Sequence, residues 1–136
     1  MKRYTTPFTQ AIKSPHARIT AALVNTDLNI DDTNAVEIYE AGISDSKIAA
    51  IDLFSIGISS AGRIIIYKYD GVTYEPLRDV VVIAITPSDS VSAWSDTIQF
   101  NDFGLETGMK LYAGITAMTS AIAVHVHAAD YEEVLW

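Results

Sequence analysis

The chain is divided into short apolar runs, each followed by turn-forming residues, and this division limits its possible folds more than any other feature. The runs are rich in Ile, Val, Tyr and Phe, and they cover residues 17–24, 36–40, 47–58, 63–69, 77–85, 93–100, 109–115 and 121–128. Turn residues separate them, as at Asp70-Gly71, which is a strong hairpin signal. Short runs of this composition with frequent turns are typical of a sandwich or barrel. We therefore predict an all-β, antiparallel, jelly-roll-like sandwich of about eight strands.

Side chains alternate between the two faces of a strand, so the pattern also predicts which residues form the core. The inward set is Ile51, Leu53, Ile64, Ile66, Val80, Val82, Ile98, Phe100, Leu111, Ile122, Val124 and Val126. Burying each of these side chains contributes roughly 1.5–3 kcal/mol before the loss of chain entropy is subtracted. We expect such a core to be stable without a metal ion or a disulfide.

Three of the runs carry apolar side chains on both faces, although an antiparallel sheet with one wetted face should alternate apolar and polar residues. The outward set is Phe54, Ile56, Ile65, Tyr67, Val81, Ile83 and Ile85. Large exposed apolar patches tend to mark interfaces. We predict that these residues form the interface of a homo-oligomer. The alternative is that the N-terminal arm or a loop of the same chain covers them.

Residues 1–16 contain Pro7 and Pro15 and show no apolar period, which predicts an extended N-terminal arm before a single sandwich domain at 17–136. Four of the nine basic residues precede the first acidic residue, Asp27. These four are Lys2, Arg3, Lys13 and Arg18. We expect them to dock the arm on the acidic surface of a neighbouring protein rather than on its own core. A frayed, solvated terminus is the alternative.

Composition argues against several classes of function. A length of 136 residues suits one domain, and a formal net charge of −8 opposes binding to nucleic acid, which needs a clustered basic surface. No apolar run is long enough for a membrane helix, and the N-terminus lacks the apolar region of a secretion signal. The chain has no cysteine, which excludes disulfides and thiolate metal sites and fits a protein made in a reducing cytoplasm.

His125 and His127 are the sharpest candidates for a metal site, because residues two apart on a strand point to the same face. A zinc site needs at least one further ligand, for which Asp130 and His16 are available. The core, however, is expected on the opposite face, so the two histidines are otherwise the solvent or interface side of an edge strand. We favour this second interpretation and predict no cofactor.

A second pattern is that of a calcium loop. Asp27, Asn29 and Asp31 have the spacing of the first ligands of such a loop. The match then fails twice, because Asp32 stands where the loop requires glycine and Ile38 stands where it requires glutamate. A polar connection between strands is the better interpretation of this segment, and an irregular calcium site is the alternative.

Motifs typical of enzymes are missing from the sequence. It contains no Gly-rich phosphate loop, no Gly-x-Ser-x-Gly turn and no His-Glu-x-x-His. Asp52 lies between Ile51 and Leu53 and is expected to face outward, and no set of base, nucleophile and oxyanion donor converges on it. Trp94 and Trp136 can stack on a sugar or a base, but single tryptophans are more often packing residues. We predict that the chain is not an enzyme.

A series of short motifs follows in a fixed order between residues 35 and 131. They are Glu40-Ala41-Gly42, Ser46-Lys47-Ile48, Ala61-Gly62-Arg63-Ile64, Tyr69-Asp70-Gly71, Leu77-Arg78-Asp79-Val80, Leu105-Glu106-Thr107-Gly108 and Ala129-Asp130-Tyr131. Because these motifs occur in this order, the chain resembles a family of small β-sandwich proteins of tailed bacteriophages. Glu106 and Thr107 replace Pro and Ala of the family's pattern, and Ala129 replaces its Gly. These changes affect turns more than the fold.

The resemblance implies a structural protein of the virion, of the capsid-decoration, head-fibre or tail-associated type, assembled in the host cytoplasm. We expect a self-associating capsid decoration or auxiliary head protein that binds the major capsid protein or another virion protein, and the resemblance favours a trimer. The alternative is a receptor- or glycan-binding sandwich module of a phage fibre or tail. The family has no catalytic residues to carry over, and the resemblance does not reach residues 1–34.

Overall fold

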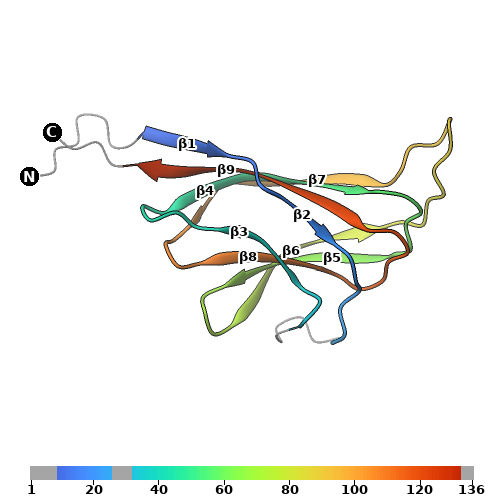
Figure 1. Ribbon diagram of the computed structural model, residues 1–136, viewed down its shortest axis with the longest axis horizontal. Helices are drawn as coiled ribbons and strands as arrows, with labels where there is room; N and C mark the ends of the chain where they lie inside the picture. The colour runs from blue at the N-terminus through green and yellow to red at the C-terminus, as the bar shows by residue number, and fades with distance from the viewer. Residues whose placement is uncertain (1–8, 26–31, 133–136) are drawn as a thin grey trace, which may run out of the picture.

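Residues 9–25 and 32–132 are described by the computed structural model, and they form two antiparallel sheets that face each other (Figure 1). The strands are β1 (Thr9–Lys13), β2 (His16–Ile19), β3 (Val36–Glu40), β4 (Ser46–Ser55), β5 (Gly62–Tyr69), β6 (Tyr74–Val82), β7 (Ser95–Leu105), β8 (Lys110–Ile115) and β9 (Ile122–Glu132). Within these two ranges, no helix is long and apolar enough to cross a membrane.

The strand order is that of a jelly roll. Sheet A has the order β1-β9-β4-β7, and β2 also pairs with β9; sheet B has the order β3-β8-β5-β6. Strands β2 to β9 therefore divide into two four-stranded sheets, β2-β9-β4-β7 and β3-β8-β5-β6, as in double-sheet jelly rolls. The predicted fold class, an all-β antiparallel sandwich, is confirmed. The described residues hold nine strands where the sequence predicted about eight.

The predicted hairpin between β5 and β6 illustrates how local residues set the topology. Gly71 has a positive φ of 98°, which glycine adopts at little steric cost. The Asp70 carboxylate accepts hydrogen bonds from the backbone N–H groups of Val72 and Thr73, both at 2.8 Å. These contacts fix the turn, so β5 and β6 pair directly.

The core lies between the two sheets and contains the predicted inward residues. Every member of that set is buried except Val80, which is half-buried against the core. Trp94 is also buried in this core, with 5% of its surface exposed, so it is a packing residue and not a platform for a sugar. Trp136 lies outside the described residues.

The prediction that Ile65 and Tyr67 belong to an exposed face is wrong. Both side chains lie outside the core cluster between the sheets, yet they are only 1% and 3% exposed. The connection between β2 and β3 covers this face of sheet B. Leu23 donates its backbone N–H to the carbonyl of Ile115 at 2.8 Å, and its side chain fills the space over Gly114, the cross-strand partner of Ile65. A loop of the same chain therefore covers this part of the outward set.

The prediction that the arm is separate from its own domain and lies along a neighbouring protein is also wrong from residue 9 onward. Residues 9–13 are extended as predicted, but as β1 they pair along their whole length with β9, and β2 pairs with β9 from His16. The sandwich therefore begins before residue 17. Of the four basic residues, Lys13 and Arg18 are exposed, whereas Lys2 and Arg3 lie outside the described residues.

Candidate functional site

Five exposed apolar side chains gather at one end of the sandwich, and we call this group the apolar end. Its members, each between 45% and 56% exposed, are Phe54, Ile56, Ile58, Ile83 and Val91. Figure 1 shows the segment between β6 and β7 projecting at this end, opposite the end where β1 begins and β9 finishes. Single exposed apolar side chains are common on monomers, whereas a contiguous apolar patch is typical of a contact with another molecule.

Hydrogen bonds tie together the three connections that carry or flank the apolar end. Ile56 donates its N–H to the carbonyl of Ala121 at 3.0 Å, and Ser120 donates to the carbonyl of Ile58 at 3.1 Å. The hydroxyl of Ser59 donates to the carbonyl of Ile83 at 2.7 Å. The chain segments 56–61, 83–94 and 116–121 therefore meet at one end, and the apolar side chains have fixed places there.

The apolar end contains only part of the predicted interface. Phe54, Ile56 and Ile83 are exposed as predicted, and Val81 on β6 is 65% exposed, whereas Ile85 is half-buried against the core. Sequence reasoning missed Ile58 and Val91. Both lie in connections, where the two-residue period of a strand does not apply.

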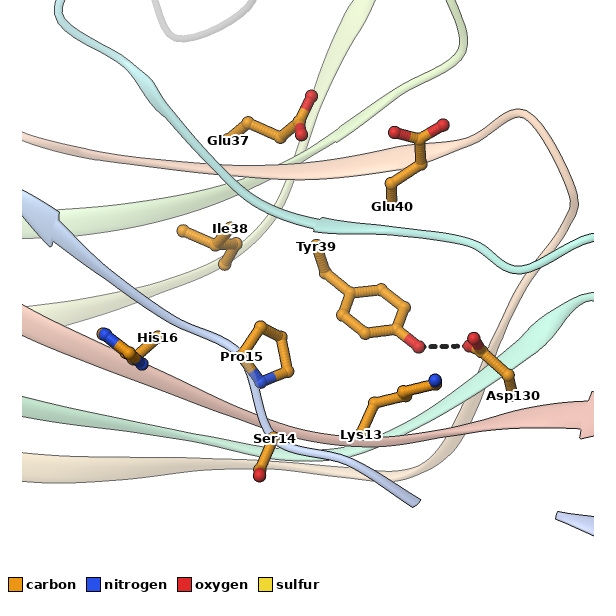
Figure 2. A pocket seen from close by; sticks show the side chains of 9 residues that line it. All are labelled: Lys13, Ser14, Pro15, His16, Glu37, Ile38, Tyr39, Glu40 and Asp130. Atoms are coloured by element: carbon orange, nitrogen blue, oxygen red, sulfur yellow. Dashed lines mark hydrogen bonds between the residues drawn. The ribbon is translucent and has the colours of Figure 1, made fainter. Parts of the chain in front are cut away.

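A second region is a cleft of about 440 Å³ between the edges of the two sheets. Residues 13–16, which link β1 to β2, line one side of it, and residues 37–40 of β3 line the other. Figure 2 shows Tyr39 pointing into the cleft toward Asp130, whereas Glu37 and Glu40 point away from it.

Four motifs of the phage resemblance meet beside this cleft, at what we call the Asp130 junction. The Asp130 carboxylate accepts hydrogen bonds from the hydroxyls of Tyr39 and Ser46, the latter at 2.5 Å. Gly42 donates its N–H to the Ser46 hydroxyl at 2.9 Å, and the Thr107 hydroxyl donates to the carbonyl of Gly42 at 2.8 Å. The junction therefore joins sheet B, through Tyr39, to sheet A, through Ser46 and Asp130.

Groups of the same chain bond the polar atoms of this junction. The Ser46 side chain is buried, its hydroxyl donates to the Asp130 carboxylate, and its oxygen accepts the N–H of Gly42. Burial, and then the hydrogen bond to Asp130, raise the pKa of Tyr39 to about 12. Asp130, which was a possible metal ligand in the sequence, is instead the acceptor that both hydroxyls share.

The raised pKa of Tyr39 predicts a loss of stability at high pH. The fold favours the neutral phenol, so the contribution of Tyr39 is complete below the unfolded pKa of about 10 and is lost as pH rises toward about 12. We expect the free energy of unfolding of the wild type to fall more steeply over this range than that of Tyr39→Phe. Urea unfolding at a series of pH values measures both slopes, and equal slopes would contradict the prediction.

The third region is a row of polar residues on the outer face of sheet A. His16 on β2, His125 on β9, Asp52 on β4 and Thr97 on β7 are successive cross-strand partners. The Thr97 hydroxyl donates to Asp52 at 2.6 Å, and His127 Nε2 lies 2.6 Å from the other Asp52 oxygen. These two hydrogen bonds, that from Thr97 first, lower the pKa of Asp52 despite its partial burial.

This row changes the interpretation of the two histidines. Both point outward from sheet A, as predicted, but β9 is an interior strand between β4 and the pair β1 and β2, not an edge strand. His127 turns to Asp52, whereas His125 lies beside His16, with ring centroids 6.0 Å apart. Across the described ranges, no three His, Asp or Glu side chains are placed to hold one metal ion.

The calcium-like segment is only partly within the described residues, because 26–31 lie outside them. Asp32, which follows, accepts hydrogen bonds from the backbone N–H groups of Val24, Asn25 and Asn34 at 2.7, 2.7 and 3.0 Å. Burial opposes ionisation of Asp32, but these three bonds outweigh it and lower the pKa of the carboxyl. Asp32 therefore organises the β2–β3 connection.

Four tyrosines cluster on sheet B near the β5–β6 hairpin, and sequence reasoning identified only one of them. Tyr69 and Tyr74 stack with centroids 4.3 Å apart, and Tyr112 contacts both rings edge-on at 5.6 and 5.2 Å. Tyr67 contacts Tyr74 edge-on at 6.4 Å. The available signal was the spacing of Tyr67 and Tyr69, which places both on the same face of a strand.

Two comparisons with known proteins found no match for this chain. No protein-family model matches the chain, and no curated protein matches it. The resemblance of the sequence motifs to phage proteins therefore stays a prediction.

Proposed function

We propose that this chain is a structural protein of a bacteriophage particle, where copies of it associate through the apolar end and decorate or reinforce the capsid. The observation that carries the self-association is the gathering of Phe54, Ile56, Ile58, Ile83 and Val91 at one end of the sandwich. The virion assignment rests on the ordered motifs of the sequence, of which four meet at the Asp130 junction.

A second copy of the chain is the partner that fits the apolar end. The chain has a formal net charge of −8, so two copies repel each other over most of their surface. The five side chains carry no charge, and contact there removes apolar surface from water with little repulsion. A symmetric oligomer brings the same patch of each copy to one interface.

The experiment is to measure molecular mass in solution by analytical ultracentrifugation. We expect the wild type to be an oligomer, with a trimer favoured by the sequence resemblance. The double variant Ile58→Asp with Ile83→Asp is expected to weaken association at least about tenfold, because each side chain is about half exposed and contributes roughly 0.7 kcal/mol or more when the interface buries the rest. Its mass should approach the 14.8 kDa of one chain.

A matched control replaces exposed apolar residues away from the apolar end. Ile43 and Val72 are 95% and 83% exposed in the turns that follow β3 and β5. The double variant Ile43→Asp with Val72→Asp should keep the oligomeric state of the wild type. A wild type that is monomeric at micromolar concentration, or equal masses for both double variants, would rule out association through the apolar end.

The place of the protein in the particle needs a separate observation. Electron cryomicroscopy of the intact particle would locate the chain, and co-purification with empty capsids but not with tails supports decoration.

The alternative function is a receptor- or glycan-binding module. The tyrosine cluster supports it, because tyrosine presents an apolar ring with a polar tip to a partner. Binding to host polysaccharide without binding to capsids would favour that alternative.

A further inference from the structure

We propose that His16 and His125 form a binding site for a divalent transition-metal ion. The site is expected to prefer Cu²⁺ and Ni²⁺, and the bound ion links β2 to β9. The two residues are direct partners on adjacent antiparallel strands. Their rings lie with centroids 6.0 Å apart and planes tilted by 36°. Metal–nitrogen distances of about 2.0–2.1 Å hold the two ligand atoms within roughly 4 Å of each other. Rings at this separation meet that requirement with small rotations.

Both imidazoles are available for an ion. Each side chain is exposed, and within the described residues neither ring makes a hydrogen bond or an ion pair with a protein group. His127 differs, because its Nε2 atom is 2.6 Å from the Asp52 carboxylate. The ligand pair is therefore the cross-strand pair His16 and His125, not the pair His125 and His127 that sequence spacing selects.

The charges around the pair favour a cation. Asp52 is the cross-strand partner of His125 on its other side, and its carboxylate interacts electrostatically with His125. The chain as a whole carries a formal net charge of −8. Asp52 therefore attracts a bound divalent ion, whereas Arg18, two residues from His16 on the same outward face of β2, opposes it.

The number of protein ligands selects the kind of metal. A structural zinc site is closed by four protein ligands, and across residues 9–25 and 32–132 no group of three suitable side chains exists. Two imidazoles with the remaining positions open to water suit Cu²⁺ or Ni²⁺, which accept tetragonal nitrogen and oxygen ligands. Among divalent ions, Cu²⁺ is expected to bind most tightly and Zn²⁺ less tightly.

The position of the site gives it a structural consequence. His16 is the first residue of β2, a strand of four residues that follows the Ser14-Pro15 break. An ion held by His16 and His125 adds a side-chain link to the backbone pairing of the two strands. Because the folded chain holds both ligands together, the ion binds it more tightly than the unfolded chain and raises stability by mass action.

The test uses the full chain without a histidine tag, with thermal unfolding measured in the absence and presence of Ni²⁺ and, separately, Cu²⁺. The melting temperature of the wild type should rise by several degrees with either ion. His16→Ala and His125→Ala should each abolish the rise and weaken the affinity, measured by calorimetry, at least about tenfold. His127→Ala is the matched control, since it removes an exposed histidine of the same strand and should keep the rise.

A spectroscopic measurement on the wild type gives an answer that does not depend on how the variants fold. The electron paramagnetic resonance spectrum of the Cu²⁺ complex should show coupling to two imidazole nitrogens, and that of His16→Gln should show one. An unchanged melting temperature in the wild type, or equal shifts in all four proteins, would overturn the proposal. Phe54 of the apolar end and His125 line one pocket on sheet A, so the measurement is repeated on the double variant Ile58→Asp with Ile83→Asp, which should show the same rise in melting temperature.

Discussion

Replacing Leu53 with alanine is expected to lower the free energy of unfolding by about 2–5 kcal/mol, the largest effect of any substitution considered for this chain. Leu53 is 1% exposed and lies in β4 opposite Val124 of β9. Truncation removes buried apolar surface and leaves a cavity that well-packed neighbours fill only in part. Urea unfolding at a concentration where the chain is monomeric measures the change.

The neighbouring residue provides the control for this prediction. Phe54 is larger than Leu53 but points to the opposite face of β4, where it is 49% exposed. Phe54→Ala is expected to cost less than about 1 kcal/mol, as is usual for surface substitutions. If Phe54→Ala lost more stability than Leu53→Ala, the register of β4 would be displaced by one residue, because such a displacement exchanges the faces of a strand.

Replacing Asp130 with alanine is the second large change, with an expected cost of about 2–4 kcal/mol. The substitution removes the shared acceptor of Tyr39 and Ser46, whose side chains are buried. Hydroxyl groups left in the interior without an acceptor lose hydration that no protein contact replaces. The link between β3 and sheet A then keeps the longer hydrogen bond from the Tyr39 hydroxyl to the Ser46 oxygen, at 3.4 Å, and the apolar contacts.

A double-mutant cycle separates this network from the general effect of truncation. Tyr39→Phe removes one donor and leaves Ser46 bonded to Asp130, so its cost should be smaller than that of Asp130→Ala. The double variant should lose less than the sum of the two single variants, because both substitutions remove the same hydrogen bond. Additive losses, or a cost below about 1 kcal/mol for Asp130→Ala, would mean that the junction contributes little.

Much of the fold follows from the alternation of residues along single strands. Ile51 and Leu53 are buried and Phe54 is exposed because neighbouring residues of β4 face opposite sides, and that relation can be read within a few residues. The burial of Ile65 by the connection between β2 and β3 could not be predicted in this way. It depends on Leu23, which lies in the predicted run 17–24 but beyond the end of β2, and whose side chain packs over Gly114 of β8.

The candidate sites depend even more on pairing between distant segments. The sequence identified His125 and His127 because they are two residues apart, but the pair that meets is His16 and His125, which only the register of β2 against β9 determines. Asp130 drew attention as a possible ligand, and its partner Tyr39 did not, because contacts between sheets leave no local pattern. The exposure of Ile83 was predicted, since it lies where the period of β6 extends beyond the strand.

The position of β9 has a consequence for how the protein is made. Of the described strands, β9 leaves the ribosome last, yet β1, β2 and β4 all pair with it. Until β9 is synthesised, the backbone groups of these three strands that later pair with β9 have no partner. Such unpaired strand edges promote association with other chains. A nascent chain that ends before Ile122 cannot assemble sheet A. Translation must therefore run almost to Glu132 before the sandwich closes, and the low local content of its contacts makes that closure slow.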